Sequence, residues 1–232
     1  MSTTTEQGSE LRTERTTAKR HPERSTHEFA TVARILDEGI YCHIGFSVDT
    51  QPFVVPTAYG REGRALYIHG SSASRTLREL SEGLPLCLTV TLFDGLVLAR
   101  SAFSQSINYR SVMILGVAHV VPDADKARAL RVITEHVVPG LWADVRPPSS
   151  QELKATTVLK LDIGEASAKI RSGPPIDDEA DHTLPCWAGE LPFRLAPQPL
   201  VRDARVAELV EPPAYLTQYR RPSRDGAASD EV

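Results

Sequence analysis

The feature that most constrains the fold is the hydrophobic period, which changes from helical to extended at about residue 40. Three extended segments follow one another, at residues 40–48, 52–59 and 65–69, and only short polar turns separate them. Short strands that are consecutive in sequence and joined by tight turns pair antiparallel with their neighbours. The pattern therefore predicts a three-stranded meander of the kind that opens a small β-barrel.

Later segments continue this extended pattern. Residues 86–98 and 110–121 are long runs rich in Val, Leu, Ile and Thr, and Asp94-Gly95 within the first predicts a turn or a bulge. Residues 156–163 and 168–170 are extended again. We expect these last two segments to close the sheet.

Two helices are expected beside the strands. Ser25-Thr26-His27-Glu28 has the spacing of a capping box, apolar residues follow at helical spacing, and Gly39 supplies a stop. A second helix is predicted from Asp123 to about Val137, because Pro139-Gly140 follows it. The fold class expected from the whole pattern is mainly β with flanking helices.

The ends of the chain differ in composition from its middle. Residues 1–24 hold almost nothing to bury and are expected to be a disordered arm, and the same holds for a tail at residues 222–232. Between them, residues 25–221 are expected to form one domain. Beyond Gly173 the prolines disfavour a long helix or an internal strand, which predicts an extended C-terminal arm over about residues 173–221.

Composition excludes several classes of protein. A net charge of −4 gives no general attraction to nucleic acid. The three cysteines, Cys42, Cys87 and Cys186, have no Cys-x-x-Cys spacing, which argues against a disulfide framework and against a zinc site. No apolar run approaches the ~20 residues of a membrane span, and residues 1–24 lack the apolar centre of a secretory signal. We expect a cytoplasmic protein without a metal, a nucleic acid or a membrane as partner.

Two segments suggest a phosphate site. In the first, Tyr67–Arg75, an extended run ends in small hydroxyl residues and a cation, so Ser71, Ser74 and Arg75 are candidate ligands of an anion. The alternative is an ordinary strand-to-helix turn in which Ser74 caps the helix and Arg75 is solvated. In the second, Asn108–Val112, Arg110 and Ser111 precede an apolar strand. The two segments together could clamp one phosphate.

The order of these features resembles a known family. Gln51–Tyr59, Leu66–Leu80, Tyr109–Gly116, Gly173-Pro174-Pro175 and Pro185–Gly189 succeed one another as in the flavin-binding split-barrel proteins related to pyridoxamine 5′-phosphate oxidase, particularly the branch of nitroimidazole-resistance proteins. The resemblance covers roughly residues 20–195. It implies an FMN-binding split β-barrel of about six antiparallel strands and a homodimer that shares two flavins.

The resemblance also implies roles for single residues. Val55, Pro56 and Thr57 match the strand whose backbone runs along the flavin ring, and His69 matches a position near the ribityl chain or phosphate. Arg75 and Arg110 match the two phosphate contacts, although Arg75-Thr76 replaces the Arg-Lys pair of pyridoxamine 5′-phosphate oxidases. Trp187 matches a tail residue that reaches the flavin pocket.

The function that these features predict is an FMN-dependent oxidoreductase acting on a small organic substrate, with no catalytic residue assigned. Two alternatives stay open. The chain could be a flavin-binding or sensing module without turnover. It could also bind haem or a deazaflavin in the same groove, with His43, His69 or His119 as an axial ligand.

Overall fold

Antiparallel strands dominate the computed structural model, which describes residues 11–222. Within that range the order in the sheet is β1-β9-β6-β5-β2-β3-β4-β8-β7, and β10 pairs with β5. The strands are β1 (Ser25–Thr26), β2 (Tyr41–Val48), β3 (Gln51–Glu62), β4 (Ala65–Ser71), β5 (Pro85–Leu98), β6 (Ser106–Val117), β7 (His119–Val120), β8 (Thr156–Asp162), β9 (Glu165–Arg171) and β10 (Gly189–Pro192). The predicted fold class, mainly β with flanking helices, is confirmed.

The sheet curls into a barrel with one open seam. β3 joins its two halves, because residues 51–58 pair with β2 and residues 59–62 pair with β4. On the opposite side β6 approaches β8 without a ladder between them, and a Cβ on Gly116 would lie only 2.9 Å from Leu161 Cδ1. One apolar core fills the space between the two halves. This arrangement is a split barrel, as the family resemblance of the sequence implies.

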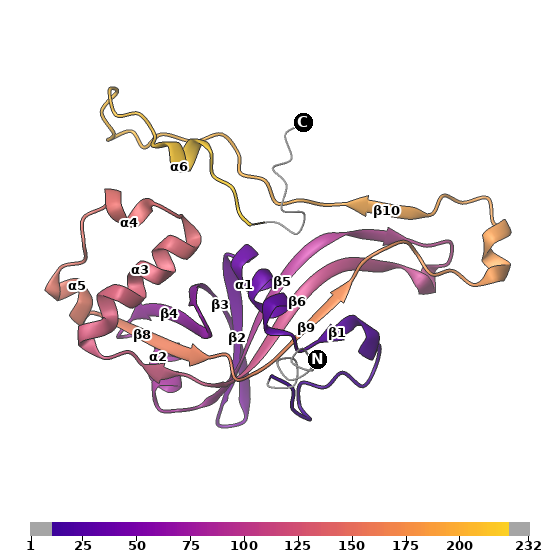
Figure 1. The fold of residues 1–232 in the computed structure, drawn as a ribbon, viewed down its shortest axis with the longest axis horizontal. Helices are drawn as coiled ribbons and strands as arrows, with labels where there is room; N and C mark the ends of the chain where they lie inside the picture. The colour runs from indigo at the N-terminus through magenta and orange to yellow at the C-terminus, as the bar shows by residue number, and fades with distance from the viewer. Residues whose placement is uncertain (1–10, 223–232) are drawn as a thin grey trace, which may run out of the picture.

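Short helices cover the ends and one side of the barrel (Figure 1). The helices are α1 (Phe29–Glu38), α2 (Arg75–Ser81), α3 (Lys126–Val137), α4 (Leu141–Asp144), α5 (Ser150–Lys154) and α6 (Ala214–Thr217). Short 3-10 turns occupy Pro22–Arg24, Ala102–Ser104, Asp123–Asp125 and Glu179–Thr183. α1 and α2 bury apolar residues in the barrel core, whereas α3 packs on the outside of β3 and β4. No helix within residues 11–222 has both the length and the apolarity to cross a bilayer.

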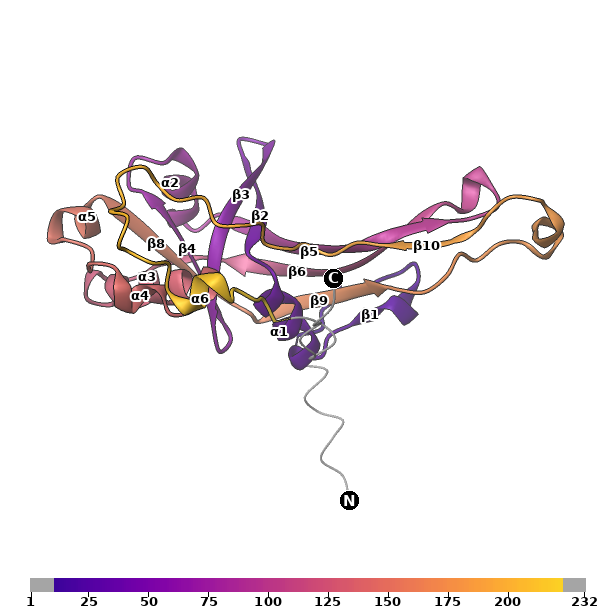
Figure 2. The ribbon, with the colours of Figure 1, turned by 90° about the horizontal axis from the view of Figure 1, so that it is seen from above.

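β5 and β6 form a hairpin that extends well beyond the barrel (Figures 1 and 2). Their pairing shifts between Phe93 and Gly95, which confirms the bulge predicted at Asp94-Gly95. β10 runs along the outer half of β5, with Gly189 opposite Leu98 and Pro192 opposite Gly95. The prolines of the arm thus permit a short edge strand, as expected where only one side of a strand is paired.

The N-terminal region differs from the prediction. Ser25 and Thr26 form β1 and pair with β9, so they do not cap α1, whose N-cap is Glu28 without a side-chain hydrogen bond. Part of the arm expected to be disordered, residues 11–24, packs on the domain: Leu11 is fully buried in the core, and its carbonyl accepts from the N–H of Ala166. A single apolar residue among polar ones gave too weak a pattern to predict this contact. The expectations for residues 1–10 and 223–232 lie outside the described residues.

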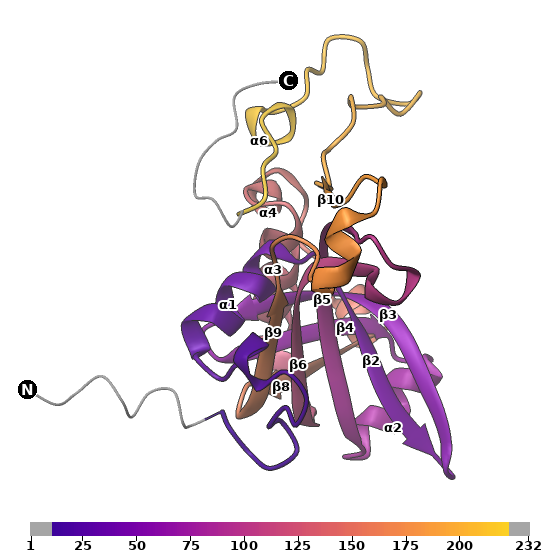
Figure 3. The same cartoon turned by 90° about the vertical axis from the view of Figure 1, so that its right-hand side faces the viewer.

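The C-terminal arm is fixed at both of its ends (Figure 3). β10 holds it on the projecting hairpin. Farther along, the Arg221 guanidinium donates to the carbonyls of Asp37, Glu38, Gly39 and His136, at the C-terminal ends of α1 and α3. Backbone carbonyls at helix C-termini lack intrahelical partners and carry partial negative charge, so they suit a cation.

Candidate functional site

The strand expected to run along a flavin ring has an open edge. Within the described chain, residues 51–58 of β3 pair with β2 alone, and Pro52 and Pro56 lie on this edge. Val55 and Phe53 pack against the core, whereas Val54 and Pro56 point outward. The hydroxyl of Thr57 donates to the carbonyl of Ala58 over 3.3 Å. Because the second edge is not paired, its backbone groups are available to a ligand.

The loop between β4 and α2 brings together the first group of predicted phosphate ligands. Ser71 is exposed, and its hydroxyl accepts from the N–H of Ala73 over 3.2 Å. Ser74 is the N-cap of α2, but its side chain makes no capping hydrogen bond. The exposed Arg75 guanidinium lies 4.7 Å from the centroid of the Phe53 ring. Phe53 therefore links this loop to the open edge of β3, and the two predicted contacts lie at one end of the barrel.

Arg110 does not lie with the predicted phosphate ligands Ser71, Ser74 and Arg75. Its guanidinium donates to both oxygens of Asp94, over 2.8 and 2.6 Å, and to both oxygens of Glu38, one of them over 2.8 Å. These two carboxylates raise the pKa of Arg110 far above its ordinary value through their hydrogen bonds. The local charge is therefore net negative, which opposes an approaching phosphate.

The path along the sheet separates the two arginines as well. Phe53, which lies against Arg75, belongs to a row of cross-strand partners that continues through Phe46 of β2 and Leu86 of β5 to Gly116 of β6. Arg110 lies six residues from Gly116 along β6. At the usual rise per residue this separation is about 20 Å. The prediction that one phosphate bridges Arg75 and Arg110 is wrong within one chain.

Two other predicted contacts lie elsewhere. Ser111 points to the outer face of β6, and its hydroxyl donates to the carbonyl of Lys169 over 3.4 Å. Trp187 precedes β10 and is 69% exposed, with its indole folded back over Gly189. Since Gly189 pairs with Leu98, Trp187 lies about 40 Å along β5 from Leu86. It does not reach the Ser71–Arg75 loop of its own chain, because pairing with the projecting hairpin carries the arm away from the barrel end.

The three candidate axial histidines occupy different surroundings. His43 is half-buried on the outer face of β2, between Pro56 of β3 and Thr89 of β5, and its ring meets the Tyr41 ring edge-on at 5.7 Å. His69 on β4 reaches solvent, although neighbouring atoms desolvate it enough to lower its pKa. His119 on β7 is exposed. Among residues 11–222, no three metal-binding side chains gather into one group.

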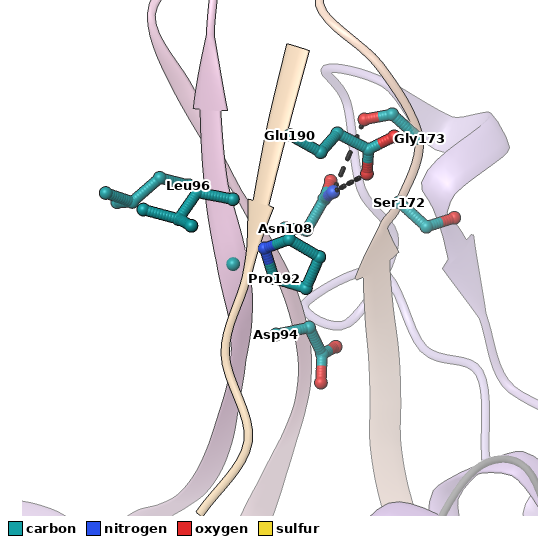
Figure 4. Close-up of a pocket in the computed structure, with 9 residues that line it drawn as sticks. Asp94, Leu96, Asn108, Ser172, Gly173, Glu190 and Pro192 are labelled. Atoms are coloured by element: carbon teal, nitrogen blue, oxygen red, sulfur yellow. Dashed lines mark hydrogen bonds between the residues drawn. The ribbon is translucent and has the colours of Figure 1, made fainter. Parts of the chain in front are cut away.

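A groove of about 370 Å³ lies where β10 meets the outer half of the hairpin (Figure 4). The buried Asn108 points into it and donates to a carboxylate oxygen of Glu190 over 2.6 Å and to the carbonyl of Gly173 over 3.3 Å. Arg171 in turn donates to the side-chain oxygen of Asn108. These groups satisfy one another's hydrogen-bonding capacity, so we interpret the groove as a structural contact that fixes the arm to the hairpin. Sequence reasoning missed it, because Asn108 and Glu190 are 82 positions apart.

The sequence and the fold identify the family. A family model described as pyridoxamine 5′-phosphate oxidase matches residues 28–170, which is more than half of the chain. The chain belongs to the pyridoxamine 5′-phosphate oxidase family. The match covers the barrel from α1 to β9 and leaves out the C-terminal arm.

Two solved structures are similar to this chain over more of its length than the family model covers. The flavocytochrome Anf3 from Azotobacter vinelandii shares 42% sequence identity with a TM-score of 0.84, and the match covers 90% of this chain and 97% of that one. An FAD and heme binding protein from Mycobacterium smegmatis shares 32% identity with a TM-score of 0.82, over 84% of this chain and 96% of that one. No curated protein shows significant sequence similarity.

A more distant structure supports the fold alone. A protein described as a 5-nitroimidazole antibiotic resistance protein, from Bacteroides thetaiotaomicron, shares 22% identity with a TM-score of 0.52. The match covers 61% of this chain and 82% of that one.

Proposed function

We propose that this protein binds both a flavin and a haem and acts as an oxidoreductase that passes electrons between them and a small molecule. The observation that carries the proposal is the 42% identity to a flavocytochrome over nearly the whole of both chains. The similar protein from Mycobacterium smegmatis is described as binding FAD and heme. Two such descriptions favour this function over a flavin module that lacks haem.

The open edge of β3 and the Ser71–Arg75 loop, which lie at one end of the barrel, fit a flavin. Backbone groups on the unpaired edge of β3 at Val55–Thr57 can hydrogen-bond the polar rim of a flavin ring. Ser71 and Ser74 offer hydroxyls to a phosphate, and Arg75 offers a positive charge. We propose FAD as the flavin, because the Mycobacterium smegmatis protein is described as binding it. FMN, the flavin expected from the sequence, presents the same ring and a phosphate to these residues.

His43 fits a haem better than the other two histidines do. An axial ligand needs a neutral imidazole on an apolar surface that a flat ring can cover. His43 lies on the outer sheet face beside Tyr41, which is 54% exposed, and one strand from Val54, which is 69% exposed. A bound flavin supplies two-electron transfer, and a haem supplies one-electron transfer. The chain's own part is to fix both groups and to keep water away from them.

The experiment is reconstitution of the purified protein with haem, followed by absorption spectroscopy of the wild type and three variants. His43→Ala is expected to lose the Soret band while it retains flavin absorbance, and His69→Ala and His119→Ala serve as matched controls. Loss of the Soret band in a control variant and not in His43→Ala would contradict the ligand assignment. Absence of the band from the wild type would contradict haem binding.

Turnover is tested separately from binding. If the protein is an oxidoreductase, the flavin-loaded form oxidises a reduced nicotinamide in steady state, and stopped-flow absorbance shows the haem reduced after the flavin. A protein that holds both groups and shows no turnover with reduced nicotinamides would favour the sensing or storage alternative.

A further inference from the structure

The backbone donors of the loop between β4 and α2 are already used within the chain. The N–H groups of residues 72–74 donate to the carbonyl of Ala155 and to the hydroxyl and carbonyl of Ser71, over 2.8 to 3.2 Å. Backbone groups that are satisfied in this way offer little to an anion. A phosphate held by this loop would therefore depend on side chains, and the cation among residues 71–75 is Arg75.

The Arg75 side chain is held by an aromatic ring. Its guanidinium makes no hydrogen bond and no ion pair with residues 11–222, and it lies 4.7 Å from the centroid of the Phe53 ring. An exposed arginine without a partner samples many rotamers, and it loses that freedom when it binds an anion. The contact with Phe53 restricts the side chain before any ligand arrives.

The Phe53 ring is itself fixed by the barrel core. Phe53 of β3 lies opposite Phe46 of β2, and their rings stack with centroids 5.5 Å apart and planes 21° apart. Phe46 is buried in the core cluster, and Phe53 packs against that cluster. A row of contacts thus runs from the core through Phe46 and Phe53 to Arg75, which lies 22 positions after Phe53 in the sequence.

The chemistry of this contact suits a phosphate. A guanidinium is attracted to the face of an aromatic ring, and its N–H donors, which lie in its own plane, match the oxygens of a phosphate. The ring can therefore fix the cation without using the donors that the ligand needs. We propose that Phe53 is a positioning residue, which holds the Arg75 guanidinium in place for the phosphate of a flavin. The inference rests on the flavin site proposed above.

Two ligands that differ only in the phosphate test this role. FMN carries the phosphate and riboflavin lacks it, so the ratio of their dissociation constants, measured by fluorescence titration, isolates the phosphate contact. Phe53→Leu is expected to reduce the preference for FMN roughly two- to fivefold, the worth of an exposed cation–π contact. Phe53→Tyr keeps an aromatic face and should retain the preference. A general disturbance of the fold would weaken both ligands alike.

The chain offers a matched control. The Arg64 guanidinium lies 4.4 Å from the centroid of the Phe29 ring on α1. Phe29→Leu removes a contact of the same kind and should leave the preference for FMN unchanged. In an Arg75→Ala background, Phe53→Leu should have no further effect on the preference, because Phe53 acts through Arg75.

Nuclear magnetic resonance of the flavin-free protein tests the contact without a ligand. The Arg75 Hδ protons are expected to be shifted upfield by the Phe53 ring in the wild type and to lose that shift in Phe53→Leu. Absence of the shift from the wild type would overturn the proposal. So would an unchanged preference for FMN in Phe53→Leu, or an equal loss in the Arg75→Ala background. A wild type that binds neither FMN nor riboflavin would instead contradict the flavin site itself.

Discussion

Replacing Arg110 separates a structural role from the phosphate role that its sequence context suggested. Arg110→Met keeps the length of the side chain but leaves Glu38 and Asp94 without their cation. Removing one partner of a buried ion pair costs ~3–5 kcal/mol. The two carboxylates keep 20% and 25% of their surface exposed, which allows some hydration. We therefore expect a loss at the lower end, about 3 kcal/mol, or a Tm lower by about 6–12 °C.

Urea unfolding followed by circular dichroism measures this change. A triple variant with Glu38→Gln and Asp94→Asn added should recover part of the loss, because it removes the unpaired charges. Flavin affinity of the folded Arg110→Met protein is expected to match that of the wild type, since about 20 Å separates Arg110 from the Ser71–Arg75 loop. A variant of wild-type stability with weakened flavin binding would refute this reasoning.

Three further predictions concern other parts of the molecule. Leu11→Ala should lower the free energy of unfolding by about 2–5 kcal/mol, because Leu11 is fully buried in the core; an unchanged urea midpoint would mean that the segment does not dock. His136 contacts the Gly39 carbonyl, and its burial lowers its pKa from 6.5 to about 4. The unfolded chain therefore takes up the proton first, and stability should fall by up to about 3 kcal/mol as the pH drops from 6.5 to 4. His136→Gln should lose less over that range, and equal losses would contradict the assignment. Arg75→Ala should weaken flavin binding about 10- to 100-fold by fluorescence titration, with Arg78→Ala as control; equal affinities would place the phosphate elsewhere.

Local sequence patterns predicted most of the barrel. Alternation of apolar residues locates β2 to β6, because one face of each strand must meet the core. Asp49 and Thr50 both adopt positive φ, 48° and 67°, as a tight hairpin turn requires. Asp94-Gly95 marks the bulge, since glycine tolerates the backbone there, and a Cβ would lie 2.7 Å from the carbonyl oxygen of Leu191.

Contacts between distant residues were beyond such patterns. The hydroxyl and cation around Arg110 resembled a phosphate loop, but its partners Glu38 and Asp94 come from other elements and are recognisable only in the folded chain. The strand in the arm could not be predicted for the same reason, because β10 forms only by pairing with β5 of the hairpin. The open edge at Val55–Thr57 and the Ser71–Arg75 loop could be located together from the sequence, since neighbouring strands of one meander position both.

Native mass spectrometry of the protein, purified from cells supplied with iron and a haem precursor, measures directly whether one chain binds both a flavin and a haem. We expect each chain to carry the added mass of one flavin and one haem, and His43→Ala to carry the flavin alone. A wild-type chain that carries flavin without haem, or neither group, under these conditions would contradict the proposed function.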